Sequence, residues 1–61
     1  MKRYLVSPHS EGEMTFATLE EAMVFAEEAF ERQVLTDMSA IGVYLDGQTV
    51  GRFGMEGWEV A

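Results

Sequence analysis

Several residue types that carry common protein functions are absent or scarce in this chain of 61 residues. It contains no cysteine, which excludes disulfides and zinc sites with thiolate ligands. Four residues are Lys or Arg against eleven Asp and Glu, which gives a formal net charge of −7. Because contacts with phosphate groups depend on clustered basic side chains, direct binding to nucleic acid is not expected.

Long hydrophobic runs are missing as well. None approaches the length of about 18 residues that a membrane-spanning helix needs. The apolar stretch that follows the first three residues, Tyr4–Val6, is too short for a secretory signal. The sequence therefore predicts a cytoplasmic protein without membrane contacts.

A single small domain, residues 1–61, is what this length allows. Hydrophobic residues make up 48% of the chain, which is too large a share for a disordered acidic segment. A domain of this size buries only about 60% of the surface that its unfolded chain exposes. Because no disulfide can supplement so small a core, we expect self-association to do so and predict a homodimer.

The clearest local signal is a helix that begins after Thr18 and continues to Gln33. The Thr18 hydroxyl can accept a hydrogen bond from the backbone amide of Glu21, and the Glu21 carboxylate can return to Thr18 as in a capping box. Acidic residues in the first turn and Arg32 in the last suit the helix dipole. These features predict where the helix begins and ends.

With the helical period of about 3.6 residues, this segment has an apolar side and an acidic side. The apolar side consists of Leu19, Ala22, Met23, Ala26, Ala29, Phe30 and Val34, and the acidic side of Glu20, Glu21, Glu27, Glu28 and Glu31. Val24 and Leu35 fall within the acidic side and Phe25 lies at its border. A helix that packs on one sheet needs no apolar residue there, so these three are candidate contact residues for a partner.

Short extended segments flank the helix. Tyr4–Val6 is rich in strand-forming residues and is stopped by Pro8, which lacks a backbone donor. Met14–Phe16 is an optional further strand. After the helix, 40–45 alternates between small and bulky residues, and 48–53 can return antiparallel to it.

The turn between these last two strands is Asp46-Gly47, which suits the positive φ values of a type I′ hairpin. Residues 54–61 contain two glycines and Trp58, and they are either a tail folded back on the domain or a flexible segment that docks on a partner. These elements predict an α+β fold with βαββ order. It is a two-layer sandwich of one amphipathic helix on a mostly antiparallel three-stranded sheet.

A two-residue hairpin loop also fixes which side chains face the helix. In this register Val43 lies opposite Val50 on the core side, and Ala40 lies opposite Phe53 on the open side of the sheet. The open side then displays Tyr44 and Phe53. Exposed aromatic residues on a small domain are typical of a partner-binding surface, in the simplest case for a second copy of the chain.

Residue arrangements that carry catalysis or cofactor binding are not found in this sequence. His9 is the sole histidine, and its loop with Glu11 and Glu13 is better interpreted as solvated than as a metal site, which usually needs three ligands in fixed geometry. The six glycines match neither the dinucleotide-binding fingerprint nor the phosphate loop. We therefore expect no enzyme activity, no metal and no cofactor.

The sequence favours a small acidic, non-enzymatic module for protein–protein interaction. The candidate partner-binding residues are Val24, Phe25, Tyr44, Phe53, Trp58, Glu20, Glu27 and Glu31. Carboxylates along a rigid helix can imitate the phosphates of nucleic acid, so the partner of an inhibitor or adaptor of this kind would be a basic nucleic-acid-binding protein. Two alternatives remain open: a helix face that is acidic only for solubility, and a dimeric domain that binds a small ligand or regulates.

Overall fold

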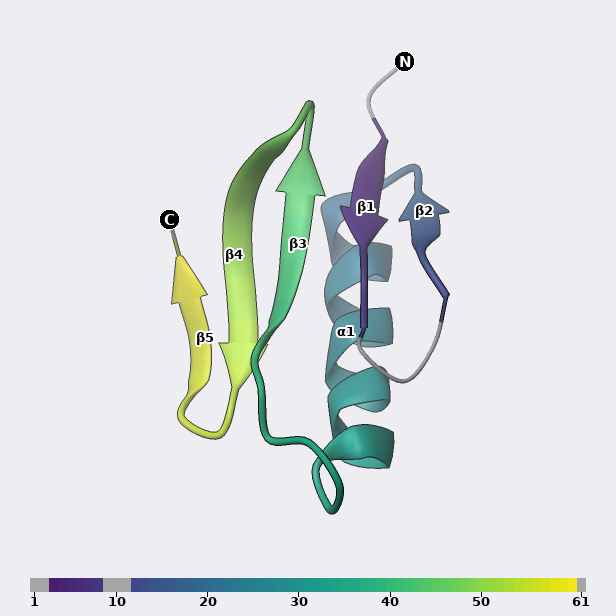
Figure 1. Cartoon of the computed structure of the whole chain (residues 1–61). Coiled ribbons are helices and arrows are strands. Elements are labelled where there is room, and N and C mark those ends of the chain that lie inside the picture. Colours follow the sequence, from purple (N-terminus) through teal and green to yellow (C-terminus); the bar gives the residue numbers. More distant parts are fainter. Residues whose placement is uncertain (1–2, 9–11, 61) are drawn as a thin grey trace.

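One helix, α1 (Leu19–Gln33), packs on a five-stranded antiparallel sheet in the computed structural model of the chain, which describes residues 3–8 and 12–60 (Figure 1). The sheet has the order β2-β1-β3-β4-β5, and all neighbouring strands are antiparallel. The strands are β1 (Tyr4–Val6), β2 (Met14–Phe16), β3 (Ile41–Leu45), β4 (Gln48–Gly54) and β5 (Gly57–Val60). The predicted α+β class is confirmed.

The predicted three-stranded sheet is wrong in detail, because two further strands extend it at its edges. The optional segment Met14–Phe16 does form β2, which pairs with β1. Part of the C-terminal segment folds back as β5, with Trp58 opposite Phe53 of β4. Gly57 has a φ of 94°, which permits the tight turn between these strands.

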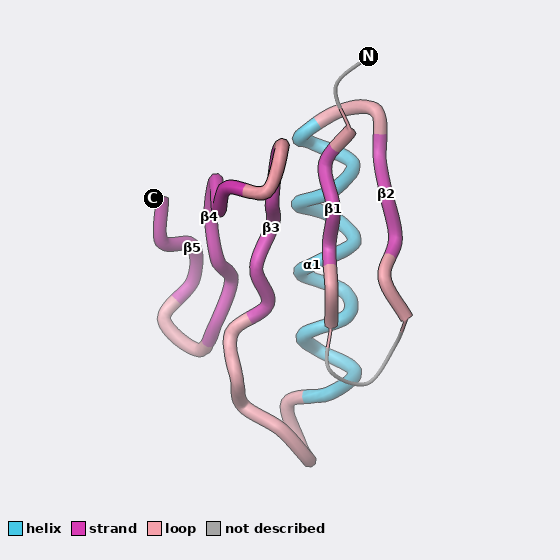
Figure 2. Tube along the Cα trace, turned by 45° about the horizontal axis from the view of Figure 1, so that its top comes forward, coloured by secondary structure: helices cyan, strands magenta, loops and turns pink. Residues whose placement is uncertain are grey.

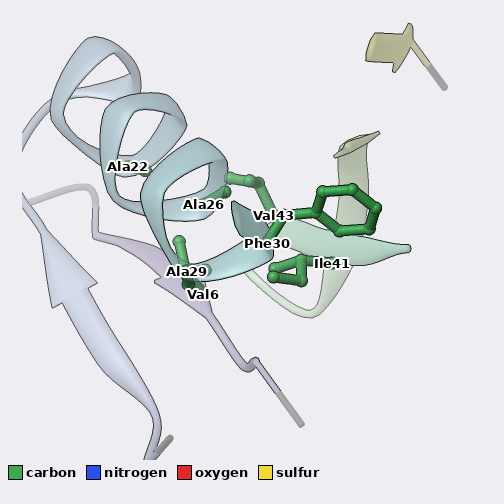
Figure 3. Packing of buried hydrophobic residues seen from close by; sticks show 7 residues of the cluster. All are labelled: Val6, Ala22, Ala26, Ala29, Phe30, Ile41 and Val43. Atoms are coloured by element: carbon green, nitrogen blue, oxygen red, sulfur yellow. The ribbon is translucent and has the colours of Figure 1, made fainter. Parts of the chain in front are cut away.

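The core lies between α1 and the central strands. Among the described residues, the buried hydrophobic side chains of this core are those of Val6, Ala22, Ala26, Ala29, Phe30, Ile41 and Val43 (Figure 3). Because alanine has a small side chain, the three buried alanines let the helix backbone lie close to β1 and β3. The helical periodicity of the sequence therefore identified the correct buried side of α1.

The predicted helix start at Thr18 is confirmed. The backbone amide of Glu21 donates to the Thr18 hydroxyl over 3.2 Å, and that hydroxyl donates in turn to the Glu21 carboxylate over 3.0 Å. The return contact of Glu21 thus involves the Thr18 side chain and not its backbone amide. At the other end, the buried Gln33 side chain donates to the carbonyl of Ser39 over 3.1 Å and ties α1 to the segment before β3.

A β-bulge changes the predicted pairing of β3 with β4. Val43 lies opposite Gly51 and not Val50, and Ile41 lies opposite Phe53, because the register shifts by one residue between Val43 and Tyr44. The shift turns Phe53 to the helix side, where its ring lies 5.4 Å from that of Phe30. The predicted position of Phe53 on the open side is therefore wrong.

The predicted type I′ turn is present, since both central residues have positive φ, 52° at Asp46 and 79° at Gly47. We expect Gly47→Ala to lower the free energy of unfolding by about 1–2 kcal/mol, because a Cβ is disfavoured in the left-handed region. Nothing lies within 4 Å of an added Cβ at Gly47, so the loss would come from the backbone alone. Urea unfolding followed by circular dichroism measures it.

Gly51→Ala is the control, because an added Cβ at Gly51 would meet no atom closer than 3.4 Å and the φ of Gly51 is not positive. There the substitution should leave stability unchanged or raise it by up to about 1 kcal/mol. Equal losses at the two positions would contradict the turn assignment.

Candidate protein-binding groove

The open side of the sheet, opposite α1, is more polar than predicted. Tyr44 is half-buried on this side, and its hydroxyl would lie 2.6 Å from a Cβ added at Gly42, so the ring lies flat over β3. Arg52, opposite Gly42, is exposed there instead of Phe53. The open side therefore has fewer aromatic residues than the predicted homodimer interface required. The homodimer stays a prediction.

The edge of the sheet at β5 is tied to the helix by Trp58. Its indole Nε1 donates to the Glu27 carboxylate over 2.7 Å, and its ring lies 5.1 Å from that of Phe53. Trp58 therefore packs over its own sheet, which was one of the two alternatives for this residue. Glu27 is half-buried and its carboxylate accepts this hydrogen bond, so it differs from the exposed carboxylates on the acidic side of α1.

On the other flank of α1, next to β2, lies a shallow groove of about 420 Å³. We call it the acidic groove; its lining residues are Phe16, Glu20, Glu21, Val24, Phe25 and Glu28. Phe16 comes from β2 and the others from α1. The rings of Phe16 and Phe25, 5.2 Å apart and inclined by 41°, form its wall.

The helical spacing of the sequence arranges this groove. Glu20, Val24 and Glu28 follow one another at intervals of four residues and therefore form a row along α1. Glu21 and Phe25 form a parallel row nearer to β2 by the same spacing. Apolar and acidic side chains thus alternate along the helix, and the Val24 side chain is 53% exposed in the middle of the carboxylates.

The chemistry available in the acidic groove is limited to charge and apolar contact. Among the described residues its lining has three carboxylates and three apolar side chains, with no hydroxyl, thiol, imidazole or amine. A cationic group can pair with the carboxylates, and an aliphatic or aromatic group can cover Val24 and Phe25. This combination suits recognition of a basic surface and offers no nucleophile or general base beyond exposed carboxylates.

The structure brings three of the predicted site residues together, Glu20, Val24 and Phe25, in the acidic groove. It separates the other candidates: Glu31 is exposed on α1 outside the groove, Glu27 is bonded to Trp58, and Phe53 packs on the core. Tyr44 lines a different hollow, on the open side of the sheet, and Leu35 is 94% exposed beyond the end of α1.

Three lining residues of the groove were not predicted. Glu21 and Glu28 could have been found, because each is four residues from Phe25 or Val24 on the helix. Phe16 required the position of β2 in the sheet. His9 and Glu11 of the loop considered as a metal site lie outside the described residues, and within residues 3–8 and 12–60 no group of His, Cys, Asp and Glu could hold a metal ion.

A further hollow lies on the opposite flank of α1, between the helix and β3–β5. It is lined by Leu19, Met23, Val43, Val50, Gly51, Trp58 and Val60 and has a volume of about 150 Å³. Pockets for small ligands usually start from about 300 Å³. This hollow therefore gives little support to the small-ligand alternative.

Comparison with known proteins adds no identity, since no protein-family model, curated protein or solved structure matches the chain. In the part of the chain that the structure describes, no helix combines the length and the hydrophobicity needed to cross a membrane. Any functional conclusion must come from the geometry of the site itself.

Proposed function

We propose that this chain is a non-enzymatic protein-binding module that takes a basic partner on the acidic groove. The observation that supports the proposal is the exposed Val24 and the half-buried Phe25 lying among Glu20, Glu21 and Glu28. A side that served only for solubility would have no reason to expose Val24 among its carboxylates, and Phe25, which also packs on Phe16 and the core, completes the apolar part of the surface. Together they offer an apolar contact with a charged rim, the usual anatomy of a binding surface.

The distribution of charge also favours this side of the molecule. Four of the carboxylates of α1, at Glu20, Glu21, Glu28 and Glu31, are exposed, and the one basic residue of the helix, Arg32, lies in its last turn. A basic partner is therefore attracted toward α1 before contact, and its association should be faster at low salt. A partner whose basic surface serves nucleic acid fits best, and this chain would then act as an inhibitor or adaptor by occupying that surface.

To test the proposal, the immobilised chain is used to capture proteins from the native host. The captured proteins are then compared for two variants that each remove two negative charges. We expect Glu20→Gln/Glu28→Gln to lose the captured basic proteins, because both carboxylates line the groove. Glu31→Gln/Glu56→Gln removes the same charge from exposed positions outside it and should retain them.

Surface plasmon resonance with the captured partner would make the comparison quantitative. The association rate at low salt should fall by about 3- to 10-fold for the groove variant, since charges at a binding surface act mainly on association. High salt should remove most of the difference. Equal rates for the two variants would reject the proposed function, because binding would then not depend on the groove.

A further inference from the structure

We infer that the partner enters the acidic groove as an extended basic segment that adds a strand to the free edge of β2. The inference rests on the proposed function and specifies the occupant of the same site. Three observations carry it: the edge position of β2, the spacing of charge and apolar groups along α1, and the absence of a matching segment in the chain itself.

The edge strand β2 lies directly beside the groove. In the sheet of described residues β2 is hydrogen-bonded to β1 alone, so backbone groups on its other edge are available for a further strand. Phe16 belongs to this strand and lines the groove. A segment paired with β2 would lie about 4.8 Å from it and place every second side chain on the side of α1.

The spacing along α1 matches the period of such a strand. Helical residues four positions apart rise by about 6 Å, so the carboxylates of Glu20 and Glu28 lie about one such step on either side of Val24. Alternate side chains of a strand are about 6.6–6.8 Å apart. Figure 2 shows β2 running alongside α1, so both repeats have nearly the same direction.

These dimensions specify a sequence for the occupant. The occupant would have basic residues at positions i and i+4 and an apolar residue at position i+2. Each basic residue would meet a carboxylate of α1, and the apolar residue would contact Val24 and Phe25. The chain's own basic residues are Lys2, Arg3, Arg32 and Arg52, and no two of them are spaced in this way. With a net charge of −7 on each copy as well, the occupant is a different, basic protein.

A pair of designed peptides tests the inference. One, with blocked ends, has the core Arg-Ser-Phe-Ser-Arg, which places Arg and Phe on the same side of a strand. Its isomer, Arg-Phe-Ser-Ser-Arg, has the same composition but turns Phe to the other side. We expect the first to bind about tenfold more tightly by titration calorimetry, equivalent to about 1.4 kcal/mol.

Backbone methylation of the first peptide tests strand pairing directly. N-methyl groups on the alternate amides that face β2 should abolish binding, whereas those on the other set should not, because only one set donates across an antiparallel ladder. Backbone amide signals of Met14–Phe16 should shift in NMR spectra with the unmodified peptide. Tolerance of methylation at both sets, or equal affinity of the two isomers, would overturn the added strand.

Two variants of the chain distinguish failure of the added-strand inference from failure of the proposed function. Val24→Lys places a positive charge in the groove at an exposed position, and Leu35→Lys does so outside it. If the peptides bind without strand pairing but Val24→Lys alone abolishes binding, the mode is wrong and the basic-partner function stands. If neither peptide binds, the added strand is wrong, and the groove and control charge variants with the captured partner then decide the proposed function. If Val24→Lys and Leu35→Lys both bind the peptides as the wild type does, the groove is not the site and both proposals fall.

Discussion

Replacement of Phe30 by alanine is expected to lower the free energy of unfolding by about 3–5 kcal/mol. The Phe30 side chain is 6% exposed and meets the ring of Phe53 edge to face at 5.4 Å and 88°. The substitution removes this aromatic contact and leaves a cavity between α1 and the sheet. Proteins have a total stability of about 0.05–0.15 kcal/mol per residue, so a domain this small would lose a large part of it.

Urea unfolding followed by the fluorescence of Trp58, the only tryptophan, measures the loss. Leu35→Ala is the control, because Leu35 is 94% exposed and its truncation should change stability by less than about 0.5 kcal/mol. A loss at Phe30 as small as at Leu35 would mean that the helix does not pack on β4 as described.

The parts of the fold that could be predicted from the sequence depend on residues close together in the chain. The helix start needs Thr18 and Glu21, the hairpin needs Asp46 and Gly47, and the buried side of α1 needs only the helical period. Each of these is a local physical preference that the tertiary structure does not oppose. All three are present in the structure.

The register of β4 could not be predicted from the turn alone. A regular hairpin would direct Arg52 to the core and Phe53 to solvent, which costs the desolvation of a charge and loses the burial of an aromatic side chain. The bulge at Val50 exchanges the two sides, so Arg52 is exposed and Phe53 packs on Phe30. The free energy gained by burying Phe53 and leaving Arg52 in solvent thus outweighs the regular strand pairing that a two-residue turn favours.

The candidate site was predicted in part, for a related reason. Val24 and Phe25 stood out because the helical period does not place them on the predicted apolar side of α1, and this is a property of the helix alone. Phe16, which completes the wall of the groove, faces Phe25 only because β2 forms the edge of the sheet next to β1. Sheet order is a non-local property, and a three-residue strand gives little signal of it.

Replacement of Trp58 by alanine is expected to cost about 3 kcal/mol, although Trp58 belongs to the C-terminal segment that could have been a flexible tail. The indole ring lies against Phe53 and its Nε1 donates to Glu27, so Trp58 joins β5 to both β4 and α1. Circular dichroism during urea unfolding measures the loss, since the fluorescent residue is removed.

A double-mutant cycle of Trp58→Phe and Glu27→Ala isolates the hydrogen bond from the packing. Trp58→Phe keeps an aromatic ring beside Phe53 but removes the indole donor, so each single variant should lose the bond and the pair should show a coupling of about 1 kcal/mol. No coupling, with a loss below about 0.5 kcal/mol for Trp58→Ala, would show that β5 is detachable. The apolar side of β4 would then be exposed, and Trp58 would again be a candidate contact for a partner.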